Sequence, residues 1–157
     1  MAHERILQQL RRPISVDEYR EIRETWKRHS IAEDARDIPG LISTLTDDCV
    51  YELMESGRCW EGHVGATAFY RELLGAFPHI VFDLTDIVIG PQGVCEMADV
   101  TGTNLGSWLG GAATRRSVRW QVVILFPWDS QAWLFTGEKV WSHSDDPDTV
   151  AILAGAI

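Results

Sequence analysis

Two histidines are the side chains best suited to acid–base chemistry in this sequence of 157 residues. An imidazole changes its charge near pH ~6.5, so it can take up and release protons at neutral pH. His143 stands at the end of a predicted strand, and Asp145, two residues further on, could orient its ring. His143 could equally be an exposed residue at a strand end, because the sequence Ser-His-Ser-Asp-Asp around it is polar.

His29 lies on the apolar stripe of the first long predicted helix, three residues after Trp26. It could face a cavity or be a hydrogen-bonded core residue, and Glu33, one turn further on, could bond it. His29 and Glu33 could also be two ligands of a metal, but no HExxH, HxH or CxxC motif supplies a third. The sequence has no GxGxxG or phosphate-binding loop either, so we expect neither a metal nor an organic cofactor.

Two further polar side chains could act on a substrate carbonyl. Tyr51 and Glu52 point to opposite faces of one predicted strand, and Tyr51 is the better candidate for an apolar cavity. Its phenol could donate to a developing enolate oxygen, or it could be a structural tyrosine. Asn104 could hydrogen-bond a carbonyl without transferring a proton, or it could be a turn residue in a glycine-rich stretch.

Aromatic walls for a cavity are plentiful, because the chain holds seven tryptophans. Each is more often a core residue than a ligand contact, so we expect only one or two of the candidates to line a pocket. The candidates are Trp60, Trp108, Trp120 and Trp141.

The elements that must position these residues follow from local patterns. Ser15 to Glu18 form a capping box before an apolar stripe with helical spacing, and residues 90–93, Gly-Pro-Gln-Gly, predict a tight hairpin. Helices are expected at 16–36, 38–45 and 63–77, and strands at 48–55, 80–89, 94–106, 115–128 and 133–143.

Helices that precede a run of long strands predict an α+β domain. We expect a curved antiparallel sheet wrapped around three helices from the N-terminal half, a cone with an internal cavity. Residues 1–157 would form one domain, with residues 1–14 as a flexible arm and 146–157 as a short helix or tail.

The charge balance argues against a nucleic-acid partner. The chain holds 14 Lys and Arg against 23 Asp and Glu, a formal net charge of -9, and residues 37–157 carry the excess. Nucleic-acid binding needs a basic face, so we expect no nucleic acid and a small apolar or neutral ligand. Three cysteines without a CxxC pair, no signal-peptide pattern and no apolar run of ~18 residues favour a cytoplasmic protein without membrane contact.

Five stretches carry a family resemblance through their order and spacing. They are Thr46–Glu52, Trp60–His63, Phe69–Pro78, Thr101–Arg116 and Gly137–Trp141. Over about three quarters of the chain, they resemble the SnoaL-like polyketide cyclase and ester cyclase group of the nuclear-transport-factor-2-like superfamily. Asn104 stands where many relatives have His, and His143 where they often have Asp, which puts the cyclase reaction itself in question.

The resemblance implies a cofactor-independent enzyme that binds an apolar ring- or carbonyl-bearing molecule and moves a proton, as an isomerase, cyclase or dehydratase does. His143 or His29 would be the base, and Tyr51 or Asn104 would polarise the carbonyl. A non-catalytic ligand-binding or dimerisation module is the alternative, and epoxide hydrolysis lacks its carboxylate–Arg–carboxylate set. Apolar residues on both faces of the long strands predict a homodimer through the outer face of the sheet.

Overall fold

A side-chain cap starts the first long helix where the sequence predicts it. In the computed structural model, which describes residues 2–157, helix α2 spans Val16–Asp34 and the Ser15 hydroxyl accepts a hydrogen bond from the Glu18 amide. The apolar stripe of α2 turns inward, with Ile22, Thr25, His29 and Ala32 buried. This face of α2 therefore carries His29 into the interior.

Most of the other elements lie close to the expected ranges, but the helix at 2–11 and the strand at 58–61 were not predicted, and residue 45 begins a strand instead of ending a helix. The helices are α1 (Ala2–Arg11), α3 (Ile38–Ile42), α4 (Gly62–Ala76) and α5 (Pro147–Leu153). The strands are β1 (Leu45–Leu53), β2 (Arg58–Glu61), β3 (Val81–Gly90), β4 (Gly93–Thr103), β5 (Ser117–Asp129) and β6 (Leu134–His143). The segments expected as an arm and a tail thus contain α1 and α5, and residue 1 lies outside the described residues.

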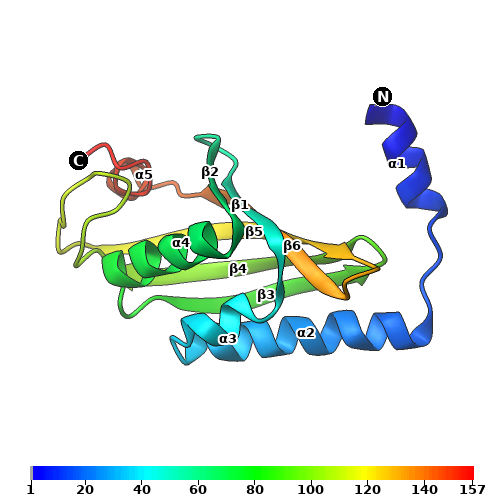
Figure 1. Ribbon diagram of the computed structural model, residues 1–157. Coiled ribbons are helices and arrows are strands. Elements are labelled where there is room, and N and C mark those ends of the chain that lie inside the picture. The colour runs from blue at the N-terminus through cyan, green and yellow to red at the C-terminus, as the bar shows by residue number, and fades with distance from the viewer. Residues whose placement is uncertain (1) are drawn as a thin grey trace.

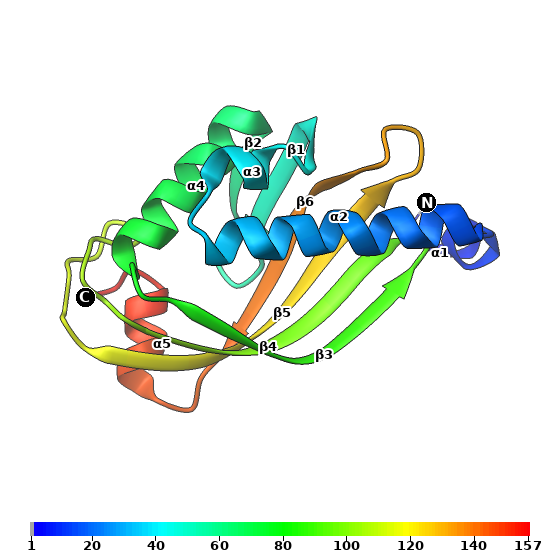
Figure 2. The same cartoon turned by 90° about the horizontal axis from the view of Figure 1, so that it is seen from below.

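The six strands form one sheet in the order β2-β1-β6-β5-β4-β3. Four neighbouring pairs are antiparallel, but β1 and β6 run parallel, which corrects the expectation of a purely antiparallel sheet. Most of the domain separates these two strands in sequence, so no tight hairpin forces them to be antiparallel. Helices α2, α3 and α4 lie over the same face of the curved sheet (Figures 1 and 2).

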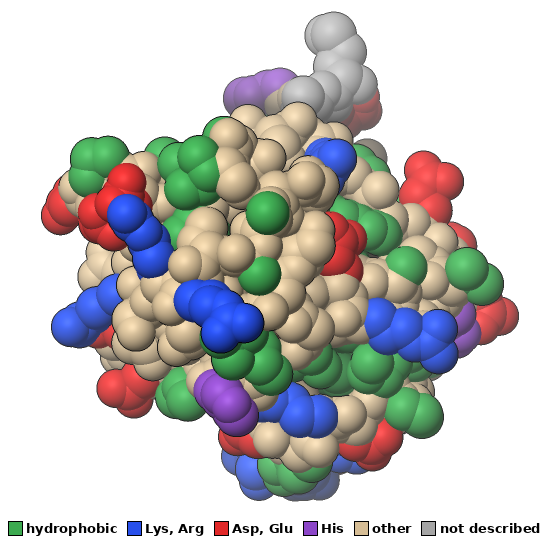
Figure 3. Space-filling view, turned by 90° about the vertical axis from the view of Figure 1, so that its left-hand side faces the viewer, with side chains coloured by type: hydrophobic (Ala, Val, Ile, Leu, Met, Phe, Trp, Pro, Cys, Tyr) green, Lys and Arg blue, Asp and Glu red, His purple; other side chains and the backbone are tan. Residues whose placement is uncertain are grey.

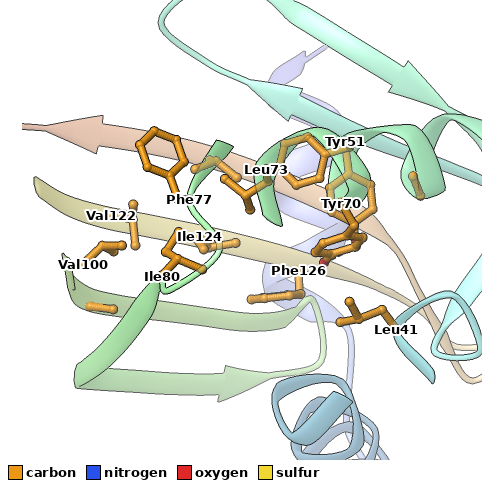
Figure 4. Close-up of a cluster of buried hydrophobic side chains, with 14 of the residues drawn as sticks. Leu41, Tyr51, Tyr70, Leu73, Phe77, Ile80, Val100, Val122, Ile124 and Phe126 are labelled. Carbon is orange, nitrogen blue, oxygen red and sulfur yellow. The ribbon is translucent and has the colours of Figure 1, made fainter. Parts of the chain in front are cut away.

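The core lies between these helices and the sheet (Figure 4). Strand β5 supplies a continuous row to it, because every second side chain is buried, as its sequence alternation predicts. The row consists of Val118, Trp120, Val122, Ile124, Phe126 and Trp128. On the molecular face shown in Figure 3, acidic and basic side chains are interspersed rather than gathered by sign.

A bulge in β6 interrupts the alternation of this strand. Trp128 of β5 pairs with Phe135, and Leu125 pairs with Lys139, so β6 has one residue more than β5 over this stretch. Gly137 and Glu138 are consequently both buried, although they are adjacent. The extra residue turns Glu138 toward the interior, to which simple alternation from Phe135 would not direct it.

Only glycine fits at the bulge. Gly137 has φ +123°, and a Cβ there would overlap the backbone carbonyl of Val50 on the parallel strand β1. Gly137→Ala should therefore lower the free energy of unfolding by about 3 kcal/mol or more, measured by urea denaturation. Gly75→Ala is the control, because a Cβ on this α4 glycine meets nothing within 4 Å and should change stability by at most about 1 kcal/mol. Equal losses in the two variants would contradict this account of the bulge.

Candidate functional site

A pocket of about 240 Å³ lies between the helices and the inner face of the sheet. Its walls are mostly apolar and include the aromatic side chains Phe69, Phe77, Phe82, Trp108 and Trp120. Figure 4 shows part of the wall, with Leu73 and Phe77 above Val122 and Ile124 of β5. Helix α5 contributes Val150 and Leu153 at one side.

The polar lining of this pocket falls into two groups. Glu33 of α2 and Glu138 of β6 are the two carboxyls that reach it from the interior. The second group comes from the end of β6 and the turn after β1, and it consists of Glu55, Ser56, Ser142, His143 and Ser144. No Lys or Arg is among the described residues that line the pocket.

Glu138 is the centre of a buried hydrogen-bond network. Its Oε1 accepts from the Tyr70 hydroxyl at 2.7 Å and lies 3.0 Å from Nε2 of His29. The His29 and Glu138 side chains are only 1% and 6% exposed. Both of these contacts fall on Oε1. Because Glu138 also lines the pocket, we infer that Oε2 is the oxygen that a bound molecule could reach.

Two tyrosines extend the network away from the pocket. The Tyr51 and Tyr70 hydroxyl oxygens are 2.9 Å apart, and both side chains are fully buried. Burial, followed by the negative charge of Glu138, raises the pKa of both phenols well above 10. Both tyrosines therefore stay neutral at physiological pH and serve as hydrogen-bond donors.

Glu33 is the second carboxyl of the pocket. Burial raises its pKa well above 4.5, and the nearby carboxyls of Glu138 and Glu96 raise it further. Among the described residues, no hydrogen bond reaches the carboxyl oxygens of Glu33, because Arg36 donates to its backbone carbonyl instead. The pocket thus combines a carboxyl that tends to hold its proton with a second carboxyl that accepts two hydrogen-bond contacts on one oxygen.

The structure separates the sequence candidates from one another. His29 and Tyr51 are buried in the network behind Glu138 and do not line the pocket. His143 does line it, with a side chain that is 70% exposed, and its Nε2 lies 3.3 Å from Oδ1 of the fully exposed Asp145. The two histidines therefore do not share one empty volume.

Asn104 is buried in the loop between β4 and β5, away from the pocket lining. Its Oδ1 accepts from the backbone amide and the hydroxyl of Thr114, and its Nδ2 donates to the carbonyl of Gly106. The side chain thus satisfies the backbone of a turn, which was the alternative to a cavity role.

Two of the four candidate tryptophans, Trp108 and Trp120, line the pocket. Trp60 packs edge-on against Phe69, with ring centroids 5.1 Å apart, and lies outside the lining. Trp141 is 40% exposed and alternates with the pocket residue Val140, so it belongs to the opposite face of the sheet. The tryptophan-rich half of the sequence therefore supplies both the pocket wall and the outer sheet face.

Sequence reasoning missed Glu138 and Tyr70 as site residues, and it considered Glu33 only as a hydrogen-bond partner of His29 or as a metal ligand beside it. The available signal was Gly137, because an isolated glycine inside a strand pattern indicates a bulge, and here a carboxylate follows it. Among the described residues, no group of three or more His, Cys, Asp or Glu side chains could hold a metal ion. None of the helices in residues 2–157 has both the length and the apolar content to cross a membrane.

Comparison with known proteins identifies the class of this domain. The model of the family described as "SnoaL-like domain" matches residues 26–134, so the chain belongs to this family. Its fold is the α+β fold of nuclear-transport-factor-2-like proteins, as in a protein of unknown function from Burkholderia pseudomallei (16% identity, TM-score 0.66, covering 85% of this chain and 97% of that one). The comparison with curated proteins found no match.

Two further solved structures share the fold. A candidate SnoaL-like polyketide cyclase from Jannaschia sp. CCS1 has a TM-score of 0.75 at 18% identity, covering 91% of this chain and 97% of that one. A candidate ketosteroid isomerase from Kribbella flavida has a TM-score of 0.59 at 15% identity, covering 82% of this chain and 83% of that one. Since these identities are low, the likeness establishes the fold and leaves the reaction to the site.

A third buried carboxyl, Glu96 of β4, links α2 to the sheet by accepting a hydrogen bond from the Trp26 indole at 2.7 Å. Burial raises its pKa from 4.5 to about 7, the Trp26 hydrogen bond opposes this shift, and Glu138 adds to it. Between pH 4.5 and about 7, Glu96 therefore holds its proton more often in the folded state than in the unfolded state. The contribution of protonated Glu96 to folding stability is complete below pH 4.5 and is lost as pH rises through about 7.

Glu96→Gln should remove this loss of stability at high pH, and it keeps an oxygen that can accept the hydrogen bond of the Trp26 indole. Between pH 4.5 and 8, the original protein should lose roughly 2–3 kcal/mol more of its unfolding free energy than the variant does. Urea denaturation at a series of pH values measures both curves. If the unfolding free energies of the two proteins changed in parallel with pH, ionisation of Glu96 would not lower the stability of the folded state.

Proposed function

We propose that this protein is a cofactor-independent enzyme that transfers a proton on a small, mostly apolar, ring- or carbonyl-bearing molecule. The observation that supports this most strongly is the environment of Glu138, whose Oε1 is held by two partners while Oε2 is left to the pocket. A base fixed on one side and free on the other is what proton abstraction from a bound substrate requires.

Two carboxyls divide the work in this proposal. Oε2 of Glu138 takes a proton from the carbon next to the substrate carbonyl, and the electrons of that C–H bond move onto the carbonyl oxygen. Glu33, which retains its proton because of its raised pKa, donates a hydrogen bond or the proton to that oxygen. Return of the proton from Glu138 to the same or another carbon completes an exchange or an isomerisation.

The apolar walls support this division of roles. Aromatic side chains such as Trp108 and Trp120 offer flat surfaces to a ring, and they keep water away from the carboxyls. Electrostatic interactions between the carboxyls and the substrate are stronger in such a site than in water. In this proposal His29 and Tyr51 belong to the hydrogen-bond network that positions Glu138. His143 and Asp145 lie at the exposed end of the pocket, and Asn104 has no role in the reaction.

Hydrogen–deuterium exchange tests the proposal before the natural substrate is identified. A panel of cyclic ketones incubated with the protein in D₂O should include compounds whose α-protons exchange catalytically, followed by NMR. Glu138→Gln should slow this exchange by about 100-fold or more, the typical contribution of a general base. Glu55→Gln, which changes a carboxyl at the mouth of the same pocket, should leave the rate within about two-fold.

Equal exchange rates in Glu138→Gln and the original protein would remove Glu138 from the mechanism. Ketones that bind without any exchange would favour the alternative function, a ligand-binding module of the same fold.

The rate of α-proton exchange should also fall as pH rises through the raised pKa of Glu33, since the protonated carboxyl of Glu33 is the active form.

We propose further that two copies of the chain associate through the outer face of the sheet. Met97, Val123 and Trp141 face one another across β4, β5 and β6 on this face, and Val123 and Trp141 are 37% and 40% exposed. An apolar row across three strands favours burial against an equivalent surface.

Trp141→Glu should convert this dimer into a monomer, because it places a charge in the middle of the apolar row. Size-exclusion chromatography with light scattering gives the mass. Val64→Glu is the control, since Val64 is an exposed apolar residue of α4, away from the outer sheet face. A monomeric original protein, or the same mass for all three proteins, would contradict the dimer.

A further inference from the structure

The hydrogen bonds of Thr44 fix one proton on His29. The Thr44 hydroxyl lies 2.7 Å from the carbonyl oxygen of Leu41, and since a carbonyl only accepts, the hydroxyl hydrogen is used there. Nδ1 of His29 lies 2.7 Å from the same hydroxyl oxygen. This nitrogen must therefore be the donor, and it carries a hydrogen.

The hydroxyl groups of Tyr70 and Tyr51 determine which atoms donate hydrogen bonds near Nε2 of His29. Tyr70 donates its single hydroxyl hydrogen to Oε1 of Glu138, so in its contact with Tyr51 it accepts. The Tyr70 oxygen therefore offers Nε2 of His29, at 2.9 Å, only lone pairs. Oε1 of Glu138, at 3.0 Å from the same nitrogen, is an acceptor as well.

Nε2 of His29 thus faces two acceptors, the Tyr70 hydroxyl oxygen and Oε1 of Glu138, so a hydrogen must lie between Nε2 and these oxygens. Imidazole is a stronger base than a carboxylate, so this hydrogen belongs on Nε2 rather than on Glu138. We propose that His29 is doubly protonated and forms a buried ion pair with Glu138, in which it acts as a positioning residue for the base.

The groups around the pair favour a cation at this place. Glu33 of α2 and Glu96 of β4 bring carboxyls toward Glu138, and the phenols from α4 and β1 are neutral. Arg36, the basic side chain near Glu33, donates to the backbone carbonyls of Pro78 and Ile80. An imidazolium thus has acidic neighbours and no directly competing cation in the network.

The ion pair has a consequence for Glu138 that an uncharged histidine would not give. A positive charge on His29, 3.0 Å from Oε1, favours the ionised form of this buried carboxylate, so Oε2 is ready to accept a proton. The catalytic part of this inference rests on the proposed function, whereas the protonation state of His29 does not. The two can therefore fail separately.

Nitrogen-15 NMR of histidine-labelled protein without ligand measures the protonation state directly. His29 should show hydrogens on both Nδ1 and Nε2 at pH 7 to 8. Glu138→Gln removes the negative charge and supplies an NH2 donor that can turn toward Nε2, so Nε2 should lose its hydrogen while Nδ1 keeps its own. Glu55→Gln should leave the His29 signals unchanged, because that carboxyl lies at the pocket mouth.

Thr44 provides a second test through a conservative pair of variants. Thr44→Val removes the acceptor for Nδ1, so fewer His29 rings should carry hydrogens on both nitrogens at pH 7. Thr44→Ser keeps the hydroxyl and should restore the signals of the original protein. Circular dichroism spectra matching the original protein show that each variant is folded.

A bare Nε2 in the original protein at pH 7 would overturn the inference, whatever the exchange experiments give. So would a doubly protonated His29 in Glu138→Gln. Conversely, both hydrogens on His29 together with no ketone exchange would leave the ion pair standing and remove only the proposed reaction.

Discussion

The buried contact between His29 and Glu138 is the interaction on which the arrangement of this domain depends. It joins the C-terminal half of α2 to the last strand, across 109 residues of sequence. A polar pair this deep is costly unless the groups that bury it also supply hydrogen-bond partners. Thr44 and Tyr70 supply partners, so the turn after α3, helix α4 and the sheet must meet at this pair.

The same requirement shapes the pocket. Because Oε1 of Glu138 is occupied, the carboxylate presents one oxygen to the pocket, beside Glu33 and in front of apolar walls. Family membership and the distant structural relatives define the scaffold, and this scaffold supports several reactions. Our proposal of proton transfer rests on the two carboxyls that this chain places in the pocket, Glu138 and Glu33, whose pKa is raised by burial.

The sequence predicted the scaffold well, because local physics decides it. The cap at Ser15, the alternation in β5 and the Gly90–Gly93 hairpin each act over a few residues, and the structure confirms them. The site was harder to predict, because it depends on a one-residue bulge at Gly137 and on contacts between distant segments. His29 was among the residues that the sequence singled out, but only the tertiary structure shows that it contacts Glu138 and lies outside the pocket lining.

A crystal structure with a bound cyclic ketone would test the central claim most directly. Our account predicts that the ligand occupies the pocket with its α-carbon within ~3–3.5 Å of Oε2 of Glu138, the distance of a reactive approach, and with its carbonyl oxygen toward Glu33. A ligand bound elsewhere, or one that lies in the pocket with Glu138 turned away or covered by other side chains, would contradict the account.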